Sequence, residues 1–206
     1  MDLRKMRGFS LVELMSTVTI ILIVTGVATM AIQQMLMSAH VTTSYNTTLA
    51  AIRQARDLAV AQRQQYSVTF NNVAVPNSIV ITQTGNGNVV DTYFLPIDVA
   101  FSAVVGLPGA PNTPDGFGAG GTAIDFDQGI VGGAKNVIYF MPDGTGQDVA
   151  GNVNNGVVYI ALSNGQNVQK LLYSSHAITV WGATGRIRGW RLFTVPANGN
   201  PGWRQN

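Results

Sequence analysis

The chain has 206 residues, of which 46% are hydrophobic and only 11% are charged, a balance that excludes a mostly disordered polypeptide. It contains no cysteine, which excludes disulfide frameworks, thiolate metal clusters and cysteine nucleophiles. The net charge of +2 at pH 7 hides an uneven distribution, because residues 64–148 hold seven Asp and one Lys, whereas residues 149–206 hold five bases and no acid. This asymmetry suggests an interaction surface.

The first predicted element is a long apolar stretch from Phe9 to Met37, preceded by the basic residues Arg4, Lys5 and Arg7. It exceeds the roughly 20 residues with which a helix crosses a bilayer. The basic residues before it favour a cytoplasmic N-terminus. A cleaved secretory signal fits poorly, because no small-residue cleavage site ends the stretch. We therefore expect residues 9–37 to be a membrane anchor that the mature protein keeps.

One carboxylate, Glu13, lies near the start of this apolar stretch. A carboxylate inside the hydrocarbon costs about 2.5–3.5 kcal/mol on insertion scales, so Glu13 requires a partner or a function there. The alternative is that Glu13 lies at the membrane interface and stays hydrated.

The run Arg7-Gly8-Phe9-Ser10-Leu11-Val12-Glu13-Leu14 resembles the processing site of type IV prepilins and pseudopilins. The resemblance implies that residues 1–8 are a leader, that a prepilin peptidase cuts after Gly8, and that the new N-terminal residue, Phe9, is methylated. Cleavage creates a positive α-amino group on Phe9, with which Glu13 of a neighbouring subunit can pair inside a helical bundle. Such a pair would remove the cost of both buried charges and fix the axial register between subunits.

Residues 38–65 continue as an amphipathic helix, with apolar positions beside basic ones at helical spacing. Neither Gly nor Pro interrupts the passage from the anchor, so both parts are predicted to form one long helix that ends near Gln64 or Gln65. Major pilins often carry a Pro within this helix, but this chain has none between Phe9 and Val75. Gly26 is the one local weak point.

Residues 66–206 consist of short apolar runs separated by Gly, Asn and Pro, a pattern typical of a β-rich domain. The predicted fold class is α+β, with a long N-terminal helix whose second half packs on an antiparallel sheet. Ser163-Asn164-Gly165-Gln166 predicts a tight hairpin turn, and residues 106–121 predict a long surface loop. The expected strands are 66–70, 78–83, 89–95, 98–104, 122–126, 136–141, 156–162, 167–173, 177–181 and 185–193.

Three passages of this part resemble a narrower family, the GspH/FimT group of minor type IV pilins and type II secretion pseudopilins. They are Ala55–Val60 with the following run to Phe70, Tyr139–Gly144, and Gly185-Arg186-Ile187-Arg188. The Gly-rich loop at 106–121 has no counterpart in this resemblance. The resemblance implies a subunit of a filament that spans the periplasm.

Enzymatic chemistry finds little support in the sequence. The two histidines, His40 and His176, have no nearby Ser and Asp in an arrangement that would define a nucleophile. Asp125 and Asp127 would share a face of a strand. One alternative is that they act as an acid/base pair or a cation site. The other is that they are solvated acids at the end of a strand. We expect the protein not to be an enzyme, and we predict no cofactor and no metal site.

The basic C-terminal segment leaves two alternatives open. Strand alternation would place Arg186, Arg188 and Trp190 on one face, where guanidinium groups suit phosphates and an indole can stack on a base. In the FimT branch a Gly-Arg-x-Arg motif is associated with DNA binding during natural transformation, and residues 185–188 match it. The other alternative is that these arginines face solvent opposite a core Ile187, or that they form ion pairs with Asp residues of an adjacent subunit.

The resemblances and the apolar stretch together predict a structural subunit, a minor pilin or pseudopilin of a type IV pilus or type II secretion pseudopilus. We expect a single-pass protein of the inner membrane with a periplasmic domain, which later joins the filament. Its expected partners are other pilin or pseudopilin subunits and the prepilin peptidase. DNA is a further partner in the alternative that uses Arg186 and Arg188.

Overall fold

The computed structural model describes residues 10–128, 135–163, 172–195 and 199–206. The chain divides into two compact units, Met1–Ser38 and Ala39–Asn206. The first unit is the apolar part of a helix. The second unit contains the rest of that helix and all the described strands.

A single helix, α1 (Leu11–Gln62), runs through the first unit and into the second, as the uninterrupted sequence predicts. It ends two to three residues earlier than expected. Arg63 adopts a left-handed conformation with φ of 53°, and the Gln64 N–H donates to the Ala59 carbonyl at 3.2 Å. This pair of features is a Schellman cap, which closes the last turn without the usual glycine.

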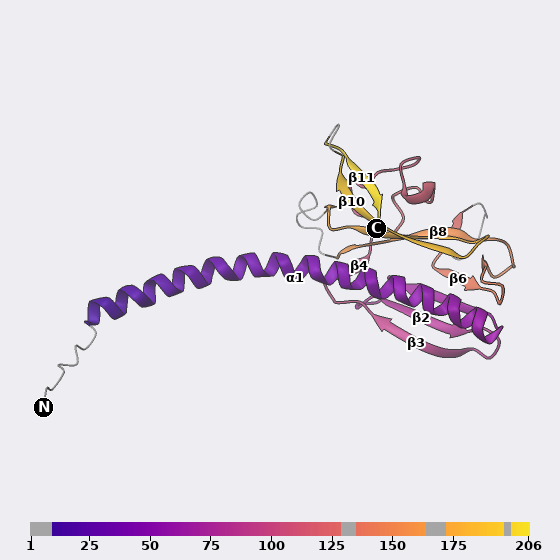
Figure 1. Cartoon of the computed structure of the whole chain (residues 1–206), viewed down its shortest axis with the longest axis horizontal. Helices are drawn as coiled ribbons and strands as arrows, with labels where there is room; N and C mark the ends of the chain where they lie inside the picture. Colours follow the sequence, from indigo (N-terminus) through magenta and orange to yellow (C-terminus); the bar gives the residue numbers. More distant parts are fainter. Residues whose placement is uncertain (1–9, 129–134, 164–171, 196–198) are drawn as a thin grey trace, which may run out of the picture. The chain divides into compact units, whose positions relative to one another are not determined.

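The strands form two antiparallel sheets (Figure 1). The first sheet has the order β3-β2-β1-β6-β7, with β1 (Tyr66–Asn71) at its centre. The second has the order β11-β10-β9-β8-β4, and β5 pairs with β8 beside it. The other bounds are β2 (Ser78–Gln83), β3 (Asn88–Phe94), β4 (Val99–Phe101), β5 (Ile124–Gln128), β6 (Val137–Phe140), β7 (Gly146–Gln147), β8 (Asn155–Leu162), β9 (His176–Trp181), β10 (Arg186–Thr194) and β11 (Pro201–Gln205).

The main core joins α1 to both sheets. From Val41 onward one face of the helix is buried, and Ile52, Ala55 and Ala59 are fully enclosed among residues such as Phe70 of β1 and Ile178 of β9. The predicted α+β fold, in which the second half of the helix packs on antiparallel sheet, is therefore confirmed. The small alanines on this face let the strands approach the helix closely.

A second, smaller cluster covers the opposite face of the second sheet. Phe117 lies in it with Tyr159 of β8, and Trp190 and Trp203 pack against its edge. The loop predicted at 106–121 supplies one side of this cluster and contains a short 3-10 helix, η1 (Pro114–Gly116). Gly118 has a φ of 72°, and a Cβ there would lie 2.9 Å from Val157, so only glycine lets the loop come this close to β8.

Several strand predictions need correction. The strand expected at 98–104 is only three residues long, because β5 takes over the same edge of β8: the Tyr159 N–H donates to the Ala123 carbonyl, and Val158 pairs with Ile124. β11 was not predicted, since its Pro-Gly start is typical of a turn rather than of a strand. The hairpin turn at 163–166 and the strand at 167–173 lie almost wholly outside the described residues; Leu172 and Tyr173, at the end of that range, are not in a strand.

Candidate functional site

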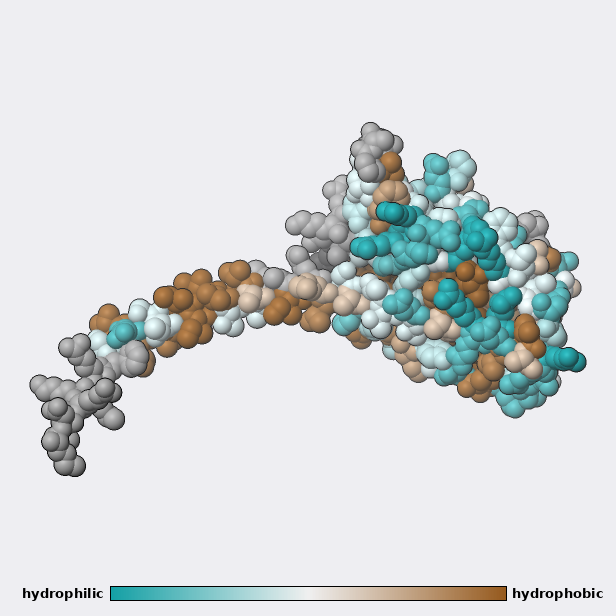
Figure 2. Space-filling model, viewed as in Figure 1, coloured by the Kyte–Doolittle hydropathy of each residue, from teal (hydrophilic) through white to brown (hydrophobic). Residues whose placement is uncertain are grey.

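The helix segment Leu11–Thr29 is long and apolar enough to cross a membrane, and none of it is buried within the structure. Its large side chains are exposed, and those of Ile20, Leu22 and Ile23 are each more than 60% exposed. Figure 2 shows this apolar surface in brown along the helix. A surface of this kind is costly in water, so it requires a cover of lipid or of other apolar helices.

The hydroxyl groups within this segment are satisfied by the helix itself. The side chains of Ser16, Thr17, Thr19, Thr25 and Thr29 each donate to a carbonyl three or four residues earlier, at 2.8–3.0 Å. A hydroxyl without a partner is expensive in hydrocarbon, whereas a hydroxyl bonded in this way is tolerated. The Ser and Thr residues of the segment are therefore compatible with a membrane span.

Glu13 lies in the first turn of α1, and its side chain is exposed. Among the described residues, no hydrogen bond or ion pair of its carboxylate is found. The predicted processing residues Gly8 and Phe9 lie outside the described residues, so their roles stay predictions.

The C-terminal residues singled out in the sequence come together around β10, but mostly in contacts with the fold itself. Arg188 forms an ion pair with Asp115 of η1, and the two side chains are 22% and 4% exposed. The other carboxylate oxygen of Asp115 accepts the hydroxyl of Thr179 at 2.5 Å. Trp190 donates its indole N–H to the same Thr179 hydroxyl at 3.0 Å. Arg188 and Trp190 thus share a face of the strand, as strand alternation predicts.

Arg188 also lies over the ring of Trp181, with its guanidinium carbon 5.9 Å from the ring centroid. Arg186, in contrast, is exposed at the start of β10. Within the described residues, only one of the two arginines of the Gly-Arg-x-Arg motif is therefore without an ion pair. Arg188 thus forms an ion pair within the chain, whereas the alternative to DNA contact expected a partner in an adjacent subunit.

Asp115 could not be identified as a site residue from the sequence, because its partners, Thr179 and Arg188, are far away along the chain. The run Pro114-Asp115-Gly116 indicates a turn, and that is the only signal it carries. Asp115 adopts a left-handed conformation, with φ of 53° and ψ of 13°, which Asp tolerates better than most residues. This conformation belongs to the turn that brings its carboxylate to β9 and β10.

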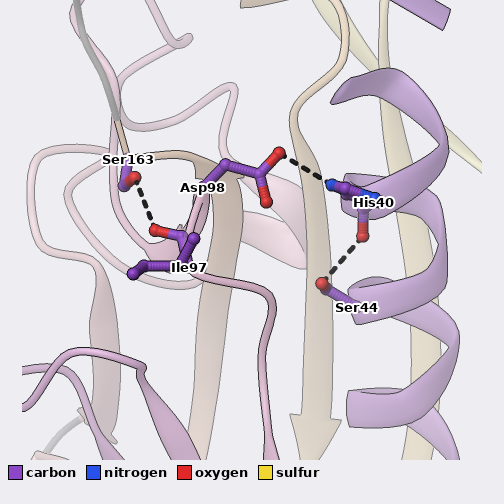
Figure 3. A network of polar contacts seen from close by, with 5 residues as sticks. All are labelled: His40, Ser44, Ile97, Asp98 and Ser163. Carbon is purple, nitrogen blue, oxygen red and sulfur yellow. Dashed lines mark hydrogen bonds and ion pairs between the residues drawn. The ribbon is translucent and has the colours of Figure 1, made fainter. Parts of the chain in front are cut away.

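His40 and Asp98 form a second polar contact far apart in sequence (Figure 3). The His40 Nδ1 lies 2.8 Å from the Asp98 carboxylate, and the carbonyl of His40 accepts the hydroxyl of Ser44 at 2.8 Å. The neighbouring Ile97 carbonyl accepts the hydroxyl of Ser163 at 3.3 Å. These contacts join α1, the loop before β4 and the end of β8.

The other candidate residues also lie in structural contacts. Asp125 is buried and forms an ion pair with Lys135 at 3.7 Å, so it is not the solvated strand-end acid expected in one alternative. His176 is buried in β9, where its Nδ1 contacts the Ser174 carbonyl at 2.8 Å and its ring lies 4.7 Å from that of Tyr45. In the described part of the chain, no group of three or more potential metal ligands is found.

Burial lowers the pKa of His176, and the positive charge of Arg191 lowers it further, while the hydrogen bond to Ser174 acts in the opposite direction. Below the ordinary His pKa of about 6.5, the unfolded chain takes up a proton that the folded chain resists. We therefore expect the melting temperature to fall as the pH falls from about 6.5 toward 5. Thermal melts of the His176→Phe variant should show a shallower fall over this range.

A matched variant separates His176 from other titrating groups. Arg191→Gln removes a positive charge beside His176 and should raise its pKa, so the loss of stability should still begin near about pH 6.5 but should end at a higher pH and be smaller in extent. A wild-type pH profile that the His176→Phe change leaves unaltered would contradict the prediction.

Comparison with known proteins gives one match. Residues 3–29 match the family model described as the prokaryotic N-terminal methylation motif. Searches of curated proteins and of solved structures return no match to the chain. The matched range contains Gly8, Phe9 and Glu13 together with the apolar segment. The chain therefore carries the N-terminal motif of a type IV pilin-like prepilin, a substrate of prepilin processing.

Proposed function

We propose that the protein is a minor pilin or pseudopilin, a structural subunit of a type IV pilus or type II secretion pseudopilus. A prepilin peptidase cleaves it after Gly8, and the helix then holds it in the inner membrane, with the globular unit in the periplasm, until it assembles. The observation that carries this proposal is the methylation motif at residues 3–29 on an apolar helix of which no part is buried.

The burial pattern of α1 supports a role in assembly. Leu11–Thr29 is exposed all round, whereas from Val41 onward one face of the same helix is buried in the core of the second unit. An apolar helix exposed on every side is suited first to lipid and then to a bundle of like helices from other subunits. The membrane and the filament are thus alternative environments for one surface.

Processing is tested by the mass and N-terminal sequence of the protein extracted from membranes of peptidase-competent cells. We expect the chain to begin at Phe9 and to carry a methyl group. Gly8→Leu should leave full-length chain, because the peptidase must accommodate the backbone beside the bond that it cuts. Gly26→Leu, within the same helix but away from the cut, is the control and should be processed normally.

A wild-type protein that begins at Met1 in such cells would contradict the proposal. So would normal cleavage of the Gly8→Leu variant at the bond before Phe9.

A second candidate function is binding of DNA by the Gly-Arg-x-Arg motif of a minor pilin. The exposure of Arg186 favours it, whereas the ion pair of Arg188 with Asp115 reduces the charge that this motif offers to phosphates. DNA binding therefore stays a prediction. It is tested by the salt dependence of DNA affinity, whose slope should shrink by about one unit in Arg186→Gln.

A further inference from the structure

A pocket of about 410 Å³ opens between the loop at 106–121 and the β10–β11 hairpin. Three aromatic side chains, Trp190, Phe193 and Trp203, line it on the hairpin side. Asn112, Thr113 and Asp115 line it on the loop side. The pocket therefore combines aromatic surface with a few polar groups, the composition of small-molecule sites.

The loop wall of this pocket is held in place by buried contacts. Both carboxylate oxygens of Asp115 are engaged, one by Arg188 and the other by Thr179. Phe117, two residues further on, packs on Trp181 with the ring centroids 4.9 Å apart. A wall anchored in this way is present before any ligand arrives, so binding need not order the loop.

Two polar atoms of the pocket-lining residues lack partners. The hydroxyl of Thr113 and the indole N–H of Trp203 are both buried, and neither has a hydrogen-bond partner among the described residues. Thr113 as a whole is 6% exposed. Buried polar groups without partners are rare in folded proteins, so these two atoms are unusual features of the residues that line the pocket.

We infer that this pocket is a binding site for a neutral saccharide. The apolar C–H face of a sugar ring matches the electron-rich face of an indole, and two indoles line the pocket. Sugar hydroxyls both donate and accept hydrogen bonds, so they suit the amide of Asn112, the hydroxyl of Thr113 and the indole N–H of Trp203. The carboxylate of Asp115 is neutralised by Arg188, which leaves no net charge to select an ionic ligand. This inference is independent of the proposed function.

The test uses the full chain, purified in a detergent without a sugar headgroup and applied to an array of neutral glycans that end in hexoses or N-acetylhexosamines. The soluble form of the strongest binder is then titrated against the protein, with tryptophan fluorescence as the readout. Thr113→Val should weaken binding at least tenfold. Because the hydroxyl of Thr113 has no protein partner, the same change should leave the melting temperature unchanged or higher.

Asn112→Ala, which alters an exposed side chain at the pocket, should also weaken binding, and it keeps the test decisive if Thr113→Val does not fold. Thr84→Val, in the exposed turn between β2 and β3, is the matched control and should bind as the wild type does. Absence of binding to every glycan by folded protein would overturn the inference. The inference would also be overturned if the wild type and both pocket variants bound the sugar with equal affinity. It would be overturned too if single-stranded DNA displaced the sugar at a concentration below that of the sugar.

Discussion

Replacing Glu13 by Val is expected to leave the protein in the membrane and to abolish its incorporation into filaments. The change removes a carboxylate that costs about 2.5–3.5 kcal/mol in hydrocarbon, so insertion should be retained or improved. Within the described residues the carboxylate has no partner, which leaves it available to the amino group of Phe9 in a neighbouring subunit. Loss of that pair removes the contact that we propose to set the axial register.

The measurement is the amount of protein in sheared or purified filaments relative to the amount in the membrane. We expect a reduction of at least tenfold for Glu13→Val. Glu13→Asp keeps the charge on a shorter side chain and should be intermediate. Ser16→Ala lies one turn further along and removes a hydroxyl that is already bonded within the helix, so it should assemble normally. Normal incorporation of Glu13→Val would show that assembly does not depend on the charge pair.

Replacing Arg188 by Ala is expected to destabilise the globular unit far more than replacing Arg186. Arg188→Ala leaves the carboxylate of Asp115, which is 4% exposed, without its counter-charge. Breaking a buried ion pair from one side costs about 3–5 kcal/mol, and the partial exposure of Arg188 points to the lower end. For a domain of this size, about 3 kcal/mol corresponds to a fall of about 6–12 °C in melting temperature. Arg186→Ala should change the stability by less than about 0.5 kcal/mol.

A double-mutant cycle tests whether the loss of stability comes from the ion pair between Arg188 and Asp115. Asp115→Ala removes the same contact from the other side, and the double variant should be more stable than the sum of the two single changes predicts. Additive losses, or a negligible loss in Arg188→Ala, would show that the ion pair contributes little. The same variants bear on the DNA hypothesis. An arginine that only binds phosphate can be removed without a large change in stability, so a large loss in Arg188→Ala would indicate a structural role for Arg188.

The helix and the fold class could be predicted from sequence because they depend on local and periodic signals. The apolar stretch after Phe9, the amphipathic continuation and the absence of Gly and Pro at the join define α1 almost to its end. The exact end could not be predicted, because the cap at Arg63 uses a non-glycine residue in a left-handed conformation. β11 was missed for the converse reason, since Pro201 and Gly202 are tolerated there in an edge strand.

The charge asymmetry of the sequence does not show which charges are paired within the fold. The asymmetry suggested an interaction surface, which stays a prediction, but most carboxylates of the acidic middle have partners within the fold. Asp98, Asp115 and Asp125 pair with His40, Arg188 and Lys135, respectively. Hydrogen bonds from Tyr93 to Asp91, from Thr145 to Asp143 and from Asn152 to Asp148 lower the pKa values of these three carboxyl groups. Composition counts charges but does not reveal which ones the tertiary structure pairs.

The residues around Asp115 could not be assigned from sequence, because each partner lies more than sixty positions away. Nothing in the runs around Thr179 or Arg188 indicates which loop will contact them. The Gly-rich composition of residues 106–121 predicted a surface loop, and that prediction did not include its attachment to the sheet. The pocket and the ion pair therefore emerge only from the tertiary structure.

The helix α1 contains both the apolar segment Leu11–Thr29 and the central element of the core of the globular unit. Ile52, Ala55 and Ala59 are fully buried on this helix, among core residues of both sheets. The globular unit therefore cannot release the buried part of the helix without exposing the core side chains of both sheets to water.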